Sequence, residues 1–342
     1  MEPWRPVEAW QTREAAIRGF AEEDRLVRAS ARPAAAIDIG SYSVHLLVAG
    51  IGRRSLEVLH DESAFLGLGR RLEAGERLGA ARATLRETIA GFVAQATALG
   101  AGTVSVVGTD PLRRAVDRDY AIDEIRSLTG VEVSVLSHEE EAMLALIGVQ
   151  QGQPIKRELA MIDVGGGSTE ILVAGPDREP AAVGLQLGAA RLTTIHVTTD
   201  PPSQGQIGAL RADVAAAITA APASNAKLLI AVGGPARSLL RVGPPRRDRE
   251  LTATRVAWAL ELLSSAPAAS IAERYNVRLS RALVLPAGAA ILEGALARYR
   301  LPQLRVAAGG LREGLILAAH HAGPLWRAEL PALTKGWAHS GG

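Results

Sequence analysis

The sequence predicts an α/β protein with two related domains and a cleft between them. Two segments, Ile37–Gly50 and Ile162–Gly175, share one pattern at a constant spacing of 125 residues: an apolar run, an acid, a turn and a second apolar run. After each segment, strand-like and helix-like patterns alternate. A chain of 342 residues with an apolar fraction of 48% can fill two hydrophobic cores. We therefore expect one folding unit to be built twice.

The first domain is expected over residues 33–136, after an N-terminal helical arm at residues 1–32 that is rich in Glu, Arg and Ala. Its helices are expected at Ala80–Leu99, where apolar residues recur at helical spacing and Gly100 suits the end, and at Tyr120–Leu128. Its strands are expected at Ala34–Ile39, Val44–Ala49, Ser55–His60, Val104–Val107 and Val131–Leu136.

The second domain is expected over residues 137–325, and residues 326–342 form a weakly patterned tail. A last helix is expected after Gly309-Gly310, and this helix could pack against the first domain. Other helices are expected after Ser137, at Gln204–Ala220 and at Thr254–Ser264. The expected strands are Leu159–Val164, Glu170–Ala174, Ala182–Gln186, Leu228–Val232 and Arg305–Ala307.

The composition excludes several functional classes. A formal charge of +2 gives no case for specific nucleic-acid binding. The absence of cysteine excludes disulfides, thiolate zinc sites and a cysteine nucleophile. No apolar run approaches the roughly 18 residues of a membrane span, and no signal-type apolar region follows Met1. We expect a cytoplasmic protein without a membrane partner.

The turn of the second repeat has the composition of a phosphate-binding loop. Three glycines let backbone N–H groups approach an anion closely, and two hydroxyls follow. Asp163 and Glu170 flank the turn, and two such carboxylates can hold Mg²⁺ next to a phosphate. The alternative is a glycine-rich hairpin with solvated acids. The candidate phosphate ligands are Gly165, Gly166, Gly167, Ser168 and Thr169.

The turn of the first repeat is a second candidate phosphate loop. Gly40 is followed by Ser41, Tyr42 and Ser43, all of which carry hydroxyls. Asp38 precedes this turn and is a candidate metal ligand through water; the alternative is an acid that caps the turn. Two facing loops, one in each domain, would clamp a phosphate chain from both sides.

Two further motifs each contain a charged candidate for the site, the carboxylate of Glu141 and the guanidinium of Arg113. Ser137 and Glu140 match a capping box at a helix start, where Glu139 and Glu140 are explained as a solvated face. Glu141 lies at the expected domain junction, where it could deprotonate a water that attacks phosphorus. Arg113 follows a buried strand and could fork onto phosphate oxygens, although alone it also fits a surface arginine.

Together these residues resemble the exopolyphosphatase and guanosine pentaphosphate phosphohydrolase family, within the superfamily of actin, sugar kinases and heat-shock ATPases. The resemblance covers about residues 34–320 and depends on six motifs in order. The motifs are Asp38–Ser43, Gly108–Arg113, Ser137–Ala142, Asp163–Glu170, Leu187–Leu192 and Gly309–Gly314.

The resemblance implies two ribonuclease-H-like domains of the actin-like ATPase type, with the active site between them. It implies that Glu141 is the catalytic glutamate, that Asp163 and Glu170 are catalytic, magnesium-associated acids, and that Arg113 contacts phosphate. The implied reaction removes the terminal phosphate of polyphosphate, or the 5′-terminal phosphate of guanosine pentaphosphate, by water attack. Mg²⁺ is the expected metal, with Mn²⁺ as a second option. We also expect a homodimer.

Several positions depart from the usual motifs: Tyr42 replaces Asn, His138 replaces Gly, Met143 replaces Arg, and Pro235 replaces Thr. From Tyr42 we expect slower turnover on polyphosphate; the alternative is that the ring packs aside and the backbone N–H groups of the loop suffice. The extra helical domain of longer members is also missing, so we expect weak binding of long chains. Two other classes stay open: a kinase or ATPase of the wider superfamily, and a non-catalytic sensor of polyphosphate or nucleotides.

Overall fold

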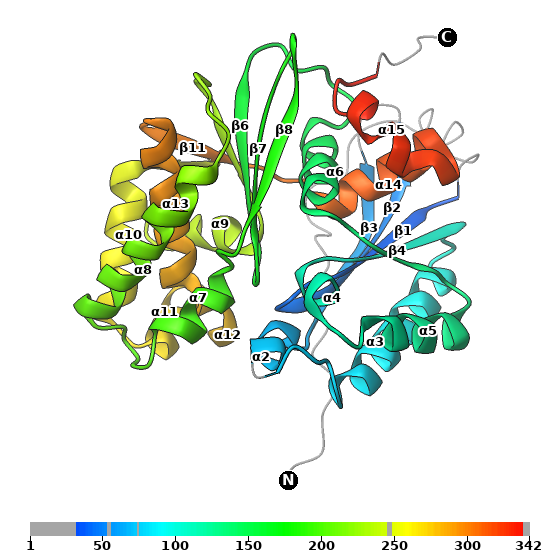
Figure 1. Ribbon diagram of the computed structural model, residues 1–342, viewed down its shortest axis with the longest axis horizontal. Coiled ribbons are helices and arrows are strands. Elements are labelled where there is room, and N and C mark those ends of the chain that lie inside the picture. Colours follow the sequence, from blue (N-terminus) through cyan, green and yellow to red (C-terminus); the bar gives the residue numbers. More distant parts are fainter. Residues whose placement is uncertain (1–31, 53–55, 74, 245–247, 338–342) are drawn as a thin grey trace, which may run out of the picture.

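The computed structural model describes residues 32–52, 56–73, 75–244 and 248–337 (Figure 1). It contains two β-sheets, each covered on both faces by helices. Residues 1–31 of the expected N-terminal arm lie outside the described residues. Within the described residues, no helix is both long enough and apolar enough to cross a membrane.

The first sheet has the strand order β3-β2-β1-β4-β5. β1 pairs antiparallel with β2 and parallel with β4, as the expected α/β plan requires. The expected strand Ala34–Ile39 is confirmed with the same bounds. The strands are β1 (Ala34–Ile39), β2 (Ser43–Ile51), β3 (Leu56–Phe65), β4 (Thr103–Gly108) and β5 (Val133–Val135).

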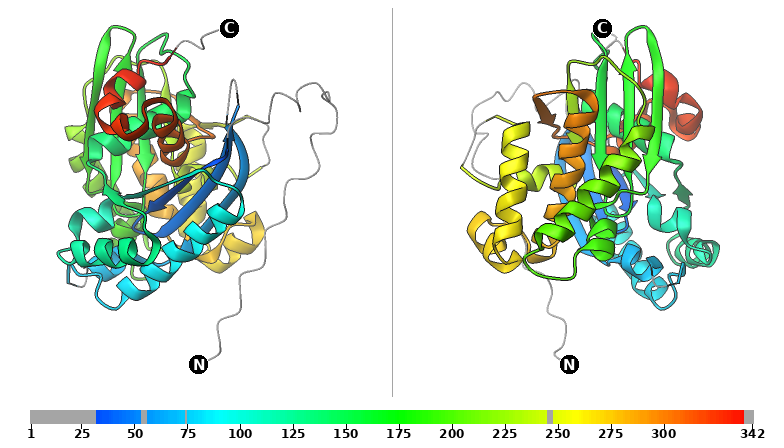
Figure 2. Two further views of the ribbon diagram at one scale, coloured as in Figure 1. Left: turned by 90° about the vertical axis from the view of Figure 1, so that its right-hand side faces the viewer. Right: turned by 60° about the vertical axis from the view of Figure 1, so that its left-hand side comes forward.

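Helices α3 (Ala81–Ala98) and α5 (Arg118–Thr129) cover one face of this sheet, where Leu85, Ile89 and Ile125 are buried. Both helices occur where the apolar spacing predicts them. Gly100 follows the first helix in the left-handed conformation, with φ of 81°, as expected of a terminating glycine. The opposite face contacts the helices that lie between the two sheets (Figures 1 and 2).

The second sheet has the order β10-β11-β9-β6-β7-β8 and repeats the first arrangement, with an added antiparallel edge strand. Its β8 begins earlier than expected, because pairing with β7 extends it through Pro180, which a sheet edge tolerates. The strands are β6 (Leu159–Val164), β7 (Thr169–Gly175), β8 (Arg178–Leu185), β9 (Leu229–Val232), β10 (Glu250–Thr252) and β11 (Gln303–Val306).

Helices α8 (Gln204–Ala217), α10 (Ala253–Ser265) and α13 (Leu285–Tyr299) cover the outer face of the second sheet. The sequence predicts the first two but not α13. Its first half, residues 285–292, is buried on every side, so the amphipathic period is confined to the last two turns. The pattern also misses the short helices α2 (Leu68–Glu73), α4 (Asp110–Arg114), α7 (Ala189–His196), α9 (Gly234–Leu239), α11 (Ala268–Tyr275) and α12 (Leu279–Ala282).

Helix α6 (His138–Gln150) lies between the sheets: Leu144 packs toward the first sheet and Leu146 toward the second. Helix α14 (Leu311–Ala322) packs against the first sheet beside it. Residues 326–333 form a further helix, α15 (Trp326–Leu333), and not a loose tail, because Leu330 is buried in the same core. The assignment of residues 33–136 and 137–325 to two domains stays a prediction.

Candidate active site

A cavity of about 130 Å³ opens between the turns of the two repeated hairpins. The turn before α4, the turn after β9 and the start of α14 complete its walls. Glu141 and Arg281 also line it, so the structure brings together residues from seven separate parts of the chain. The predicted site residues that line the cavity are Asp38, Ser41, Tyr42, Ser43, Glu141, Asp163, Gly165, Gly166, Gly167 and Ser168.

The two glycine-containing turns contact each other across the cleft. Ser41 Oγ donates a hydrogen bond of 2.5 Å to Asp110 Oδ2 at the start of α4. A Cβ atom on Gly167 would collide with both of these groups, and one on Gly166 would lie 3.0 Å from Tyr42 Cβ. The close approach of the loops therefore requires glycine at these positions.

The two hydroxyls after the glycines point to different places. Ser168 lines the cavity, and its Oγ accepts a hydrogen bond of 3.1 Å from Arg113 Nη2. Thr169 is fully buried, and its Oγ1 donates to the carbonyl of Leu187 at 2.5 Å. The structure thus separates Thr169 from the other predicted phosphate ligands.

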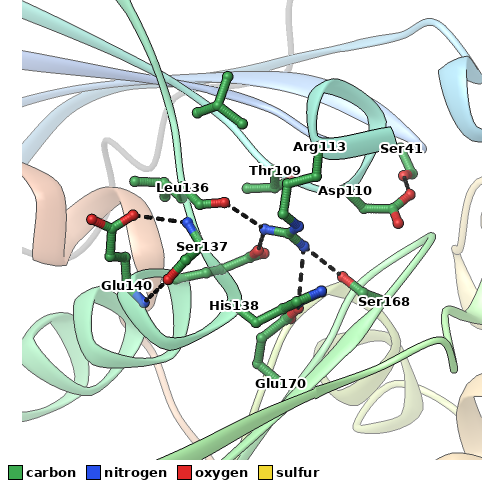
Figure 3. A network of polar contacts seen from close by, with 12 residues as sticks. Ser41, Thr109, Asp110, Arg113, Leu136, Ser137, His138, Glu140, Ser168 and Glu170 are labelled. Atoms are coloured by element: carbon green, nitrogen blue, oxygen red, sulfur yellow. Dashed lines mark hydrogen bonds and ion pairs between the residues drawn. The ribbon is translucent and has the colours of Figure 1, made fainter. Parts of the chain in front are cut away.

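Arg113 joins the two halves of the site (Figure 3). It lies on α4, and its Nη1 donates to Glu141 Oε2 at 2.6 Å and to the carbonyl of Leu136 at 3.1 Å. Its Nη2 lies 3.4 Å from Glu170 Oε1 on β7. Arg113 and Glu170 do not line the cavity themselves; they hold Glu141 and Ser168, which do.

The first turn of α6 separates Glu141 from its acidic neighbours. The predicted capping box is confirmed: Ser137 Oγ accepts from the Glu140 N–H, and Glu140 Oε2 accepts from the Ser137 N–H. Glu139 is exposed, whereas Glu141 is 8% exposed and faces the cavity. Helical geometry therefore turns one acid of the three inward.

Burial changes the protonation of the acids at this site. It raises the pKa of Glu170 to about 8, although the positive charge of Arg113 opposes the shift. Burial raises the pKa of Asp38 to about 7 and that of Asp163 to about 6. The pKa of Glu141 is raised well above its usual range by burial and by the neighbouring Glu170 charge. Four buried carboxylates thus require additional positive charge to be ionised together.

A model of the Ppx/GppA phosphatase family matches residues 47–322. The chain belongs to this family. Exopolyphosphatase 1 of Mycobacterium tuberculosis is 31% identical over 298 residues, which cover 82% of this chain and 86% of that protein. The expected hydrolase class agrees with this membership.

Solved structures of the Ppx/GppA family share the fold. The Aquifex aeolicus member matches with a TM-score of 0.70 at 24% identity, over 84% of this chain and 97% of that one. An exopolyphosphatase from Cytophaga hutchinsonii matches with a TM-score of 0.72 at 20% identity, over 83% and 96% of the two chains. The expected fold class, two ribonuclease-H-like domains of the actin-like type, is confirmed.

The acids of this Ppx/GppA site fit a divalent cation. Glu170 Oε2 and Asp38 Oδ1 are buried and lack a hydrogen-bond partner. In the part of the chain that the structure describes, one group of His, Asp and Glu side chains places its ligand atoms within 4.8 Å of one another: His138, Glu141 and Glu170. Asp38 and Asp163 lie outside this group. The assignment of Asp38, Asp163 and Glu170 as metal ligands stays a prediction.

The structure adds basic residues that the sequence reasoning missed. Arg237 of α9, Arg281 of α12 and Arg312 of α14 line the cavity. The guanidinium of Arg281 lies 4.7 Å from the centre of the Tyr42 ring. Arg312 lies in the quoted Gly309–Gly314 motif, whereas Arg237 and Arg281 have no local pattern that marks them.

Proposed function

We propose that this member of the Ppx/GppA family releases the terminal phosphate of inorganic polyphosphate by attack of water. The proposal rests on the position of Glu141, a buried carboxylate that faces a cavity between two glycine turns. The relative named exopolyphosphatase 1 supports polyphosphate as the substrate.

In this proposal Glu141 is the general base. Its raised pKa makes it a stronger proton acceptor than an exposed glutamate. The water oxygen forms a bond to the terminal phosphorus, and a water proton passes to Glu141. The bridging P–O bond breaks, and the shortened chain leaves with the bridging oxygen. Arg113, 2.6 Å from Glu141, orients this carboxylate, and it is proposed to contact the terminal phosphate when substrate is bound.

The two loops and the arginines bind the substrate. Residues 41–43 and 166–168 line the cavity from the two turns, and their backbone N–H groups are proposed to bind phosphate oxygens. The guanidinium groups of Arg237, Arg281 and Arg312 supply charge for the following phosphates.

The acids Asp38, Asp163 and Glu170 are proposed to hold Mg²⁺ or Mn²⁺, Asp38 through water. When bound, the cation neutralises charge on the phosphate oxygens. This assignment is supported by the unpartnered carboxylate oxygens of Asp38 and Glu170 and by the raised pKa values of all three acids. Their ionisation is favoured by a nearby cation.

The test is phosphate release from polyphosphates of defined length and from guanosine pentaphosphate, with and without Mg²⁺. Polyphosphate hydrolysis that requires Mg²⁺ and fails in Glu141→Gln supports the proposal. Hydrolysis of guanosine pentaphosphate alone would assign the other substrate. Incubation with ATP and a panel of sugars tests the kinase alternative, and binding without phosphate release would indicate a sensor. The homodimer and the cytoplasmic location remain predictions.

A further inference from the structure

His138 is the first residue of α6, and it stands where the related motif usually has glycine. Its Nδ1 lies 2.8 Å from Glu170 Oε1 (Figure 3). The imidazole is about 25% exposed, whereas the Glu170 side chain is about 1% exposed. The ring therefore connects a buried carboxylate to solvent.

The backbone of the second sheet leaves room for this ring. Gly184 of β8 is the direct cross-strand partner of Glu170 on β7. A Cβ atom on Gly184 would collide with the Cγ and Nδ1 atoms of His138. The imidazole thus occupies the space of a missing side chain, which fixes its nitrogen beside Glu170.

Three side chains that can bind a metal ion meet at this point. The ligand atoms of His138, Glu141 and Glu170 all lie within 4.8 Å of one another. Glu170 Oε2 is buried and has no hydrogen-bond partner, so this oxygen is available to bind an ion. Arg113 supplies the nearby positive charge, at 2.6 Å from Glu141 and 3.4 Å from Glu170.

We propose that His138 and Glu170 bind a divalent transition-metal ion beside the general base Glu141, with His138 as a nitrogen ligand. Imidazole favours ions such as Mn²⁺ and Zn²⁺ over Mg²⁺, which prefers an all-oxygen set. In this site Arg113 stays hydrogen-bonded to Glu141. The inference deepens the proposed function, because it concerns the metal of the same site, and it makes the ion preference depend on one residue.

The experiment measures Mn²⁺ binding by electron paramagnetic resonance, with no substrate and with protein that carries no polyhistidine tag. Pulsed measurements detect coupling of the Mn²⁺ spin to a ¹⁴N nucleus of imidazole. The wild-type protein should show this coupling, and His138→Gly and His138→Gln should both lose it. Mn²⁺ affinity should fall about tenfold or more, since loss of even an outer-shell partner typically costs 10- to 100-fold. Affinity for Mg²⁺, from competition, should change less than about twofold.

The matched control is His196→Gln. His196 also pairs with a carboxylate, at 2.7 Å from Asp213 Oδ2, but it lies on α7 outside the cavity. Its replacement should leave the coupling and the Mn²⁺ affinity unchanged. The inference is overturned if wild-type protein shows no ¹⁴N coupling, or if the coupling persists in both His138 variants. Because no substrate is present, these outcomes are separate from failure of polyphosphate hydrolysis.

Discussion

The two repeated hairpins share one turn geometry but differ in the residue that pairs with their aspartate. In the first, the Gly40 N–H donates to the Ser43 carbonyl at 3.1 Å; in the second, the Gly165 N–H donates to the Ser168 carbonyl at 3.0 Å. Each turn follows a strand that ends in an aspartate and one apolar residue. The equivalence thus extends to individual hydrogen bonds.

The cross-strand partners of the two aspartates differ. Asp38 is paired with His45, whereas Asp163 is paired with Glu170 at the equivalent place. The pKa of His45 lies well below its usual range because the ring is buried and faces Arg312 and other arginines. The pKa of Glu170 is raised to about 8. The first hairpin therefore pairs its aspartate with a neutral imidazole, whereas the second pairs its aspartate with another acid.

The largest effect is expected at Glu141, the proposed general base. Glu141→Gln keeps the size of the side chain but removes the base, so turnover on polyphosphate should fall by about 10²–10⁴. Substrate binding should change little. The control is Glu139→Gln, an exposed acid in the same helical turn, which should stay within about threefold. Activity of Glu141→Gln within about threefold of the parent would exclude Glu141 as the base.

The comparison itself is tested by the equivalent pair Glu170→Gln and His45→Gln. Glu170→Gln should lower turnover about 100-fold and raise the half-saturating Mg²⁺ concentration, because a metal-associated acid is lost. His45→Gln should leave the Mg²⁺ requirement unchanged, because His45 is a neutral imidazole near Arg312 and is not one of the proposed metal ligands. Metal titrations of steady-state phosphate release measure both. Equal shifts in the two variants would show that the hairpins are chemically equivalent.

A smaller effect is expected at Tyr42. Its ring packs edge-on against Phe65 at 4.8 Å and lies 4.7 Å from Arg281, so the loop keeps its backbone donors. Tyr42→Asn should therefore change turnover on polyphosphate by less than about threefold. Kinetics on polyphosphates of defined length provide the measurement. A gain of tenfold, about 1.4 kcal/mol of barrier, would indicate instead that the ring obstructs the loop.

The smallest effect concerns stability without metal. Asp38, Asp163 and Glu170 have raised pKa values of about 7, 6 and 8, so the folded protein retains protons that the unfolded chain releases above about pH 4. Stability should therefore fall as pH rises from 5 to 8. In EDTA we expect the melting temperature to drop by at least about 2 °C over this range.

Calorimetry in EDTA and in excess Mg²⁺ measures this slope. A divalent cation should reduce it, because it stabilises the ionised acids. Asp163→Asn, which cannot ionise, should also flatten it. The lowered pKa values of Asp117 and Glu158 act at more acidic pH and do not contribute here. The lowered pKa values of His45 and His138 oppose the fall at pH below their ordinary value of 6.5, so the fall should be steepest above that pH. A melting temperature that is constant or rises from pH 5 to 8 would contradict the prediction.

Much of the fold was predictable where the pattern is local. The strand Leu159–Val164 and the capping box at Ser137 agree with the structure, because alternation and cap chemistry involve residues close in sequence. Helix α13 was not predictable, because its first half, residues 285–292, is buried on every side and shows no polar face. The direction of Thr169 was also hidden, since its partner Leu187 lies on a different segment.

The repeated hairpins, their glycine turns and the candidate acids follow from the sequence alone, because turn chemistry and hydrophobic period depend on near neighbours. Which groups share the site depends on how distant parts of the chain pack together. This packing places Arg113 between Glu141 and Glu170, and His138 in the space above Gly184. These contacts join residues that are distant in the chain, and burial, which raises the pKa of the acids, exists only once both sheets have packed against the helices between them.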